Sequence, residues 1–208
     1  MKVTAISDTH GKHKQLKLTG GDLLIHSGDI SSFGNKEEIS CFLEWFSKQK
    51  YIYKIFIAGN HDFSFENQFQ NIIIPENVTY LNDSGIEIEG LQIWGSPITP
   101  TFCNLAFNRD RGKEIEFHWN KIPANTDILI THGPPYGILD ETETHFNTGC
   151  KNLLEKICTI NLKYHIFGHI HEAFGVTKIK DTIYINAASV NLEYKIRNLP
   201  YHDFEINI

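Results

Sequence analysis

Five apolar runs of strand length in this chain each lead into aspartate, asparagine or histidine. The runs cover residues 3–6, 23–25, 52–58, 128–130 and 166–167. Short apolar runs bounded by polar and glycine residues are typical of buried strands. Because the carboxyl ends of strands in a parallel sheet meet at one edge, the pattern predicts an α/β fold that gathers these polar residues at that edge.

The residues that follow the runs are of types that bind divalent metals. The candidates are Asp8, His10, Asp29, Asn60, His132, His169 and His171. Residues two apart in extended chain point to the same side, so Asp8 with His10, and His169 with His171, can each reach one ion. The two carboxylate oxygens of Asp29 could bridge two ions. Together the segments predict the two-metal site of a hydrolase.

The segments differ in how specific they are. An isolated Gly-Asp such as residues 28–29 is more often a turn or a helix cap than a metal site. The Gly-Asn-His-Asp segment at residues 59–62 is more specific, because Asn60 offers a neutral oxygen while His61 stays free for proton transfer, oriented by Asp62. The Gly-His-Ile-His segment at residues 168–171 is the hardest to explain by a structural role.

Composition bounds the partners of the chain. Its 208 residues, 41% hydrophobic and 21% charged, predict a single globular domain over residues 1–208. A net charge of -6 argues against an extended nucleic-acid surface, and no run approaches the roughly 18 apolar residues that a membrane span requires. We therefore expect a cytoplasmic protein without membrane contacts. Nothing in the sequence sets its oligomeric state.

Other segments complete the expected fold. Amphipathic patterns predict helices over residues 35–50, 110–119 and 150–160, and short strands over 78–81, 86–89 and 91–94. Residues 174–179 and 182–186 are expected to pair as a hairpin. The four cysteines form no Cys-x-x-Cys pair and are expected to be reduced, with Cys41 and Cys158 buried.

The ordered set Asp-x-His, Gly-Asp, Gly-Asn-His-Asp, His and Gly-His-x-His, spanning residues 8–171, resembles the calcineurin-like metallophosphoesterase superfamily. That resemblance implies two facing mixed β-sheets flanked by helices. Residues 107–112 and 128–140 resemble the small metallophosphoesterase-domain proteins of the class III phosphodiesterase type. Because some members of that group carry glycine where His171 stands, the histidine here implies that both metal positions are occupied.

The resemblance also implies which residues hold each metal. It assigns Asp8, His10, Asp29 and His171 to one ion, and Asp29, Asn60, His132 and His169 to the other. Nitrogen and oxygen ligands without thiolate suit two divalent transition-metal ions such as manganese, iron, zinc or nickel. The expected mechanism is in-line attack by a metal-bridging hydroxide, with His61 giving a proton to the leaving oxygen.

The expected substrate is a small phosphodiester or a cyclic nucleotide. Protein phosphatases of the superfamily usually carry Gly-Asp-x-x-Asp-Arg-Gly, whereas residues 28–34 here lack that arginine. A monoester dianion would miss this clamp more than a diester monoanion. Asn108, Arg109 and Arg111 are candidates for holding the substrate, with surface or ion-pair roles as the alternative. Residues Phe102, Phe107 and Trp119 could form a base-stacking wall, but aromatic residues in such a segment are more often core.

Three other functions are compatible with parts of this pattern. A phosphomonoesterase or protein phosphatase of the same superfamily is the first alternative. A non-catalytic metal-binding scaffold for protein interaction is the second, although such scaffolds tend to lose ligands that this chain keeps. A DNA-processing nuclease is the third, and it would be expected to show a basic surface that an acidic chain lacks.

Overall fold

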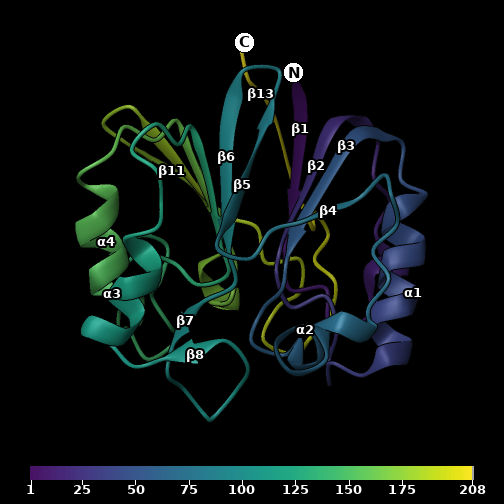
Figure 1. Ribbon diagram of the computed structural model, residues 1–208, viewed down its shortest axis with the longest axis horizontal. Coiled ribbons are helices and arrows are strands. Elements are labelled where there is room, and N and C mark those ends of the chain that lie inside the picture. Colours follow the sequence, from purple (N-terminus) through teal and green to yellow (C-terminus); the bar gives the residue numbers. More distant parts are fainter. Residues whose placement is uncertain (208) are drawn as a thin grey trace.

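Two β-sheets face each other at the centre of the computed structural model, which describes residues 1–207, and helices cover their outer faces (Figure 1). Helix α1 (Lys36–Ser47) lies outside one sheet, and α3 (Lys113–Trp119) with α4 (Lys151–Ile157) lies outside the other. The α/β class and the facing mixed sheets expected from the sequence are confirmed.

The first sheet has the order β13-β1-β2-β3-β4. Its strands are β1 (Lys2–Ile6), β2 (Gly21–Ser27), β3 (Tyr51–Ile57), β4 (Thr79–Tyr80) and β13 (His202–Glu205). Strands β1 to β4 run parallel, so β1, β2 and β3 end at the same edge. Strand β13 pairs antiparallel with β1 and was not predicted from the sequence.

The second sheet has the order β11-β12-β10-β9-β6-β5. Its strands are β5 (Ser84–Ile88), β6 (Leu91–Ser96), β9 (Ile128–Thr131), β10 (Tyr164–Phe167), β11 (Gly175–Ile179) and β12 (Thr182–Asn186). The four central strands are parallel, and the hairpin expected at the end of the chain is the antiparallel pair β11–β12. Both sheets therefore present parallel strand ends in the same region of the molecule.

The strands read as unbroken apolar runs because both of their faces are buried. Val3 and Ala5 of β1 pack in the cluster between the two sheets, together with Ile130 of β9. Ile6 at the end of β1 belongs to a second cluster that includes Phe42 of α1. Parallel strands that are covered on both faces need apolar side chains on both, which removes the alternation of a half-exposed strand.

The three predicted helices exist but are shorter than their apolar patterns. Asn35 caps α1 by accepting a hydrogen bond from the backbone N–H of Glu38 at 2.9 Å. Gly112, with a φ of 93°, precedes α3 and cannot be part of it. Helix α4 begins after Cys150, whose sulfur accepts from Leu153 N–H at 3.4 Å. Capping geometry thus sets these boundaries more narrowly than periodicity does.

Short elements connect the strands. They are α2 (Phe63–Asn67), β7 (Thr99–Pro100), β8 (Asn108–Arg109), and the 3-10 turns η1 (His13–Gln15), η2 (Phe69–Asn71) and η3 (His171–Ala173). Within residues 1–207, each helix is too short or too polar to cross a bilayer. All four cysteines are free thiols. The expected burial of Cys41 and Cys158 is wrong, because Cys41 is half-buried on α1 and Cys158 is exposed at the residue that caps the end of α4.

Candidate functional site

Tight left-handed turns follow the ends of the central strands and direct the polar side chains inward. Asp8, His10 and Asp29 have φ values of 50°, 41° and 55°, and His169 has a φ of 69°. Residues other than glycine rarely adopt this region, and such strained positions cluster at functional sites. Here the turns bring segments from both sheets to one buried cluster.

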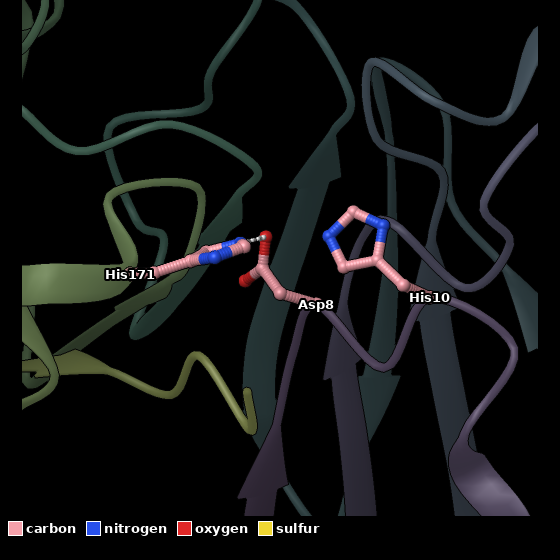
Figure 2. Close-up of side chains that lie close together, drawn as sticks. All are labelled: Asp8, His10 and His171. Carbon is pink, nitrogen blue, oxygen red and sulfur yellow. Dashed lines mark ion pairs between the residues drawn. The ribbon is translucent and has the colours of Figure 1, made fainter. Parts of the chain in front are cut away.

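The first group consists of Asp8, His10 and His171. Asp8 Oδ1 lies 3.5 Å from His171 Nε2 across the gap between the two sheets. Figure 2 shows Asp8 between the two imidazole rings, with His10 on the side of the first sheet. All three residues are buried, and each offers one ligand atom within 4.8 Å of the other two. This group could hold one metal ion.

Asp29 is the centre of the second set of contacts. Its Oδ2 lies 3.3 Å from His132 Nε2 and 3.7 Å from His10 Nε2. Asn60 Oδ1 lies 2.7 Å from His132 Nε2. Asp29 forms one possible metal-holding group with Asp8 and His132, and another with His10 and His61. A carboxylate shared by both halves of the cluster has the position that a bridging ligand requires.

His169 lies beside this set without joining its ligand groups. Its backbone N–H donates to Asp8 Oδ1 and Oδ2 at 3.1 Å and 3.0 Å. Its ring centroid is 5.1 Å from that of His132. The histidine is therefore a neighbour of both halves of the cluster, and its role as a ligand stays a prediction.

Two motif glycines are required by close approach to the carboxylates. A Cβ on Gly168 would stand 1.9 Å from Asp8 Oδ2, and a Cβ on Gly59 would stand 2.3 Å from Asp29 Oδ1. Neither carboxylate could keep its place beside a larger residue. The glycines in the Gly-Asn-His and Gly-His segments thus let the loops of the two sheets converge.

The buried charges explain why the cluster would accept cations. Burial acts to raise the pKa of Asp8, but the hydrogen bond and charge of His171 outweigh it and hold that pKa below its usual range. His132 in the same way outweighs burial and keeps the pKa of Asp29 low. Burial lowers the pKa of His10 to about 4. Ionised carboxylates beside a neutral imidazole are a donor set that divalent transition metals prefer.

His10 gives the most direct indication that this cluster fits a metal. Both of its ring nitrogens are buried, and neither has a hydrogen-bond partner within residues 1–207. A buried polar atom without a partner is costly, by about 1–3 kcal/mol. Coordination through one ring nitrogen would remove part of that cost.

Backbone carbonyls orient two of the histidines, and the sequence motifs gave no sign of them. His132 Nδ1 lies 3.0 Å from the carbonyl oxygen of Ser27, which leaves Nε2 facing Asp29. His61 Nδ1 lies 2.9 Å from the carbonyl oxygen of Ser32. A carbonyl that accepts from one imidazole nitrogen fixes the tautomer and frees the other nitrogen for chemistry.

The structure corrects the role expected for Asp62. Its carboxylate does not orient the His61 ring, and instead accepts from the backbone N–H groups of Ile30, Ser31 and Gly59 at 3.1, 3.0 and 2.8 Å. Burial and the negative charge of Asp29 raise the pKa of Asp62 to about 6. Asp62 thus ties the loop after β2 to the loop after β3.

We expect Asp62→Asn to destabilise the protein by about 1–3 kcal/mol, because the amide nitrogen cannot accept from backbone donors at this buried position. Chemical unfolding of the metal-free protein measures the effect. Glu76→Gln, at an exposed position, is the matched control. An unchanged free energy of unfolding for Asp62→Asn would contradict the role assigned to the loop contacts.

The three residues proposed to hold substrate are engaged in other contacts. Arg109 Nη1 pairs with Glu66 Oε1 at 3.1 Å, and Arg111 donates to the carbonyls of Gly149 and Thr148. Asn108 donates to a carbonyl of its own loop. These contacts agree with the ion-pair and surface alternative, and a substrate-binding role for the three residues stays a prediction. Of the three proposed stacking residues, Phe107 and Trp119 are core and Phe102 is 63% exposed.

Sequence reasoning missed a segment that lies beside the cluster. Arg197 donates to the carbonyl oxygens of His171 and Ala188. The ring of Tyr194 lies against His10, with centroids 4.9 Å apart. Both residues lie C-terminal to the last metal-binding segment and belong to no motif, so no sequence signal placed them near it.

Comparison with known proteins assigns the family. The model of the family described as calcineurin-like phosphoesterase matches residues 1–173. The chain belongs to this family. The assignment confirms the resemblance found in the sequence, and the family implies a phosphoester hydrolase that uses divalent metal ions.

Similar proteins cover nearly the whole of this calcineurin-like phosphoesterase. It is 36% identical over 225 residues to metallophosphoesterase domain-containing protein 1 of Homo sapiens, with 96% of this chain and 69% of that protein covered. It is 37% identical over 215 residues to a UPF0046 protein of Caenorhabditis elegans, with 96% and 73% covered.

Among solved structures, phosphopantetheinyl hydrolase of Mycobacterium tuberculosis has the same fold, with a TM-score of 0.64 at 13% identity over 98% of this chain and 95% of that one. A Thermus thermophilus protein, TT1561, has a TM-score of 0.61 at 14% identity over 90% and 88%. At these identities the likeness concerns the fold of the calcineurin-like phosphoesterase alone.

Proposed function

We propose that this chain is a phosphodiesterase that hydrolyses a small phosphodiester or a cyclic nucleotide. The observation that carries the proposal is the buried cluster of carboxylates and imidazoles around Asp8 and Asp29, with His61 at its side. The expectations of a single domain, a cytoplasmic location and no extended nucleic-acid surface stay predictions.

The residues that would hold two divalent ions divide into two sets that share Asp29. They are Asp8, His10, Asp29 and His171 for one ion, and Asp29, Asn60, His132 and His169 for the other. Bound ions of this kind supply Lewis acidity toward phosphoryl oxygens and an activated water nucleophile. Manganese, iron, zinc and nickel all suit these donors.

His61 is the residue that would move a proton. The contact of its Nδ1 with the Ser32 carbonyl holds the ring and leaves Nε2 available. Its backbone N–H donates to Asp29 Oδ1 at 2.8 Å, which fixes the residue next to the cluster. In the protonated form, Nε2 would donate to the oxygen of the leaving group as the phosphorus–oxygen bond breaks.

The arginine contacts favour a diester over a monoester. The chain has three arginines, Arg109, Arg111 and Arg197, and each donates to a carboxylate or to backbone carbonyls of the protein. A monoester dianion carries one more charge than a diester and gains more from a bidentate arginine. Because every arginine is engaged elsewhere, a diester substrate forgoes less binding energy than a monoester substrate does.

An assay of the metal-loaded protein tests this choice. Bis-p-nitrophenyl phosphate, p-nitrophenyl phosphate, cyclic nucleotides and single-stranded DNA are compared with manganese, nickel, iron and zinc in turn. We expect kcat/KM for the diester to exceed that for the monoester by about tenfold, the value of one charge-assisted contact. A reversed preference would indicate a phosphomonoesterase. No hydrolysis with any metal would favour the scaffold.

A further inference from the structure

A short turn over residues 189–197, which lies after the part of the chain that the family model matches, brings the chain back to the cluster. Its two arms meet where Arg197 N–H donates to the Ser189 carbonyl at 3.0 Å and where Val190 bridges to Ile196. Ser189 N–H in turn donates to the carbonyl oxygen of Ser7 at 2.8 Å. Because Ser7 precedes Asp8, the turn is anchored directly beside the metal-binding segment of β1, although it lies outside residues 1–173.

The tip of this turn is built around Asn191 and presents Tyr194. The Asn191 side-chain oxygen accepts from the N–H groups of Glu193 and Lys195 at 3.1 Å and 2.9 Å. Tyr194 itself has a φ of 56°, a strained value that the turn contacts maintain. The backbone beneath the tyrosine ring is therefore held in place.

The ring of Tyr194 packs against the two histidines of the first group. Its centroid is 4.9 Å from that of His10 and 5.4 Å from that of His171, both in edge-to-face geometry. The residue is 43% exposed, so part of the ring faces solvent at the edge of the buried cluster. Lys12 Nζ lies 5.9 Å from the ring centroid and adds a positive charge. The charge of Lys12 would favour an anionic ligand, and the exposed part of the ring could contact a planar one.

His10 separates the tyrosine from the proton-donating side chain. Its ring contacts His61 at 4.8 Å and Tyr194 at 4.9 Å between centroids. A phosphodiester has two substituents, and one of them leaves. With the leaving oxygen next to His61, the substituent that stays on phosphorus would be directed toward Tyr194.

We propose that Tyr194 is a substrate-contacting residue that selects phosphodiesters with a planar aromatic substituent. The inference rests on the proposed function, because it assumes that a phosphodiester binds at the cluster. Ring stacking is sequence-tolerant and works equally for a nucleobase and for a simple aryl group.

Binding of two poorly reactive diesters tests this inference. Calorimetry compares diphenyl phosphate with dimethyl phosphate on the manganese-loaded wild-type protein and on Tyr194→Ala, Tyr194→Phe and Lys195→Ala. We expect Tyr194→Ala to weaken diphenyl phosphate by about fivefold to tenfold and to leave dimethyl phosphate unchanged within about twofold. Tyr194→Phe keeps the ring and should bind both as the wild type does.

Lys195→Ala is the matched control, because Lys195 belongs to the same turn and its side chain pairs only with exposed Glu193. Metal content and melting temperature of each variant show whether the turn and the cluster persist. Equal weakening of both diesters in Tyr194→Ala, or none, would overturn the inference alone. Wild-type protein that binds neither diester would overturn the proposed function and this inference with it.

Discussion

Asp29→Asn should lose tight metal binding and at least about 100-fold in kcat/KM toward a phosphodiester, more than substitutions outside the ligand set usually cost. Asp29 lies within reach of ligand atoms from Asp8, His10, His61 and His132. The substitution keeps the shape of the side chain and removes the negative charge that both halves of the cluster share. Among the described residues, Asp8 is the one other carboxylate that belongs to two of these groups.

Metal content after dialysis, activity, and the melting temperature with and without a chelator measure the effect of Asp29→Asn. A metal present at about 100 times its dissociation constant stabilises the folded state by about 2.7 kcal/mol. The wild type should show this shift, and the variant should not. Asp181→Asn is the matched control, since Asp181 is exposed in the β11–β12 turn. A variant with wild-type metal content and rate would exclude a bridging role.

His61→Ala should keep its metals and lower kcat by about 10²-fold to 10⁴-fold, the usual contribution of a positioned general acid. The imidazole is held by the Ser32 carbonyl, and the hydrogen bond from His61 to Asp29 comes from the backbone N–H. Removal of the ring therefore takes away the proton donor without breaking that hydrogen bond. A substrate whose leaving group needs no proton should lose less than one with a basic leaving group.

The same variant separates two roles for His61. Its ring also forms a possible metal-holding group with His10 and Asp29. Loss of metal from His61→Ala would make it a ligand rather than an acid, and an unchanged kcat at full metal content would remove it from both roles. His145→Ala is the control, because that histidine is exposed and pairs only with Glu141.

The places of the candidate ligands in the fold could be predicted from the sequence, because each of them follows the end of a buried strand. The run before Asp8 is buried along β1, and an unbroken apolar run of this length is typical of a parallel strand that is covered on both faces. Strand β13 could not be predicted in the same way. It spans only His202–Glu205 and is defined by its pairing with β1, which lies almost the whole chain away.

The hydrogen-bond and ion-pair partners of the side chains could not be predicted from the sequence. Asp62 follows His61 directly, yet adjacent residues point in different directions and its carboxylate turns to the loop after β2. The pairing of Arg109 with Glu66, which lies far away in the sequence, could not be predicted from the motif that contains Arg109. Tyr194 reaches the cluster through a turn whose position depends on a backbone contact with Ser7. Each of these depends on long-range packing.

A crystal of the wild-type protein grown with manganese, measured at a wavelength that reveals anomalous scattering from the metal, tests the central claim most directly. We expect two anomalous peaks, both within coordination distance of Asp29. The residues around them should be Asp8, His10 and His171 for one peak, and Asn60, His132 and His169 for the other. Peaks at other residues, or none at a cluster that is otherwise intact, would contradict the account.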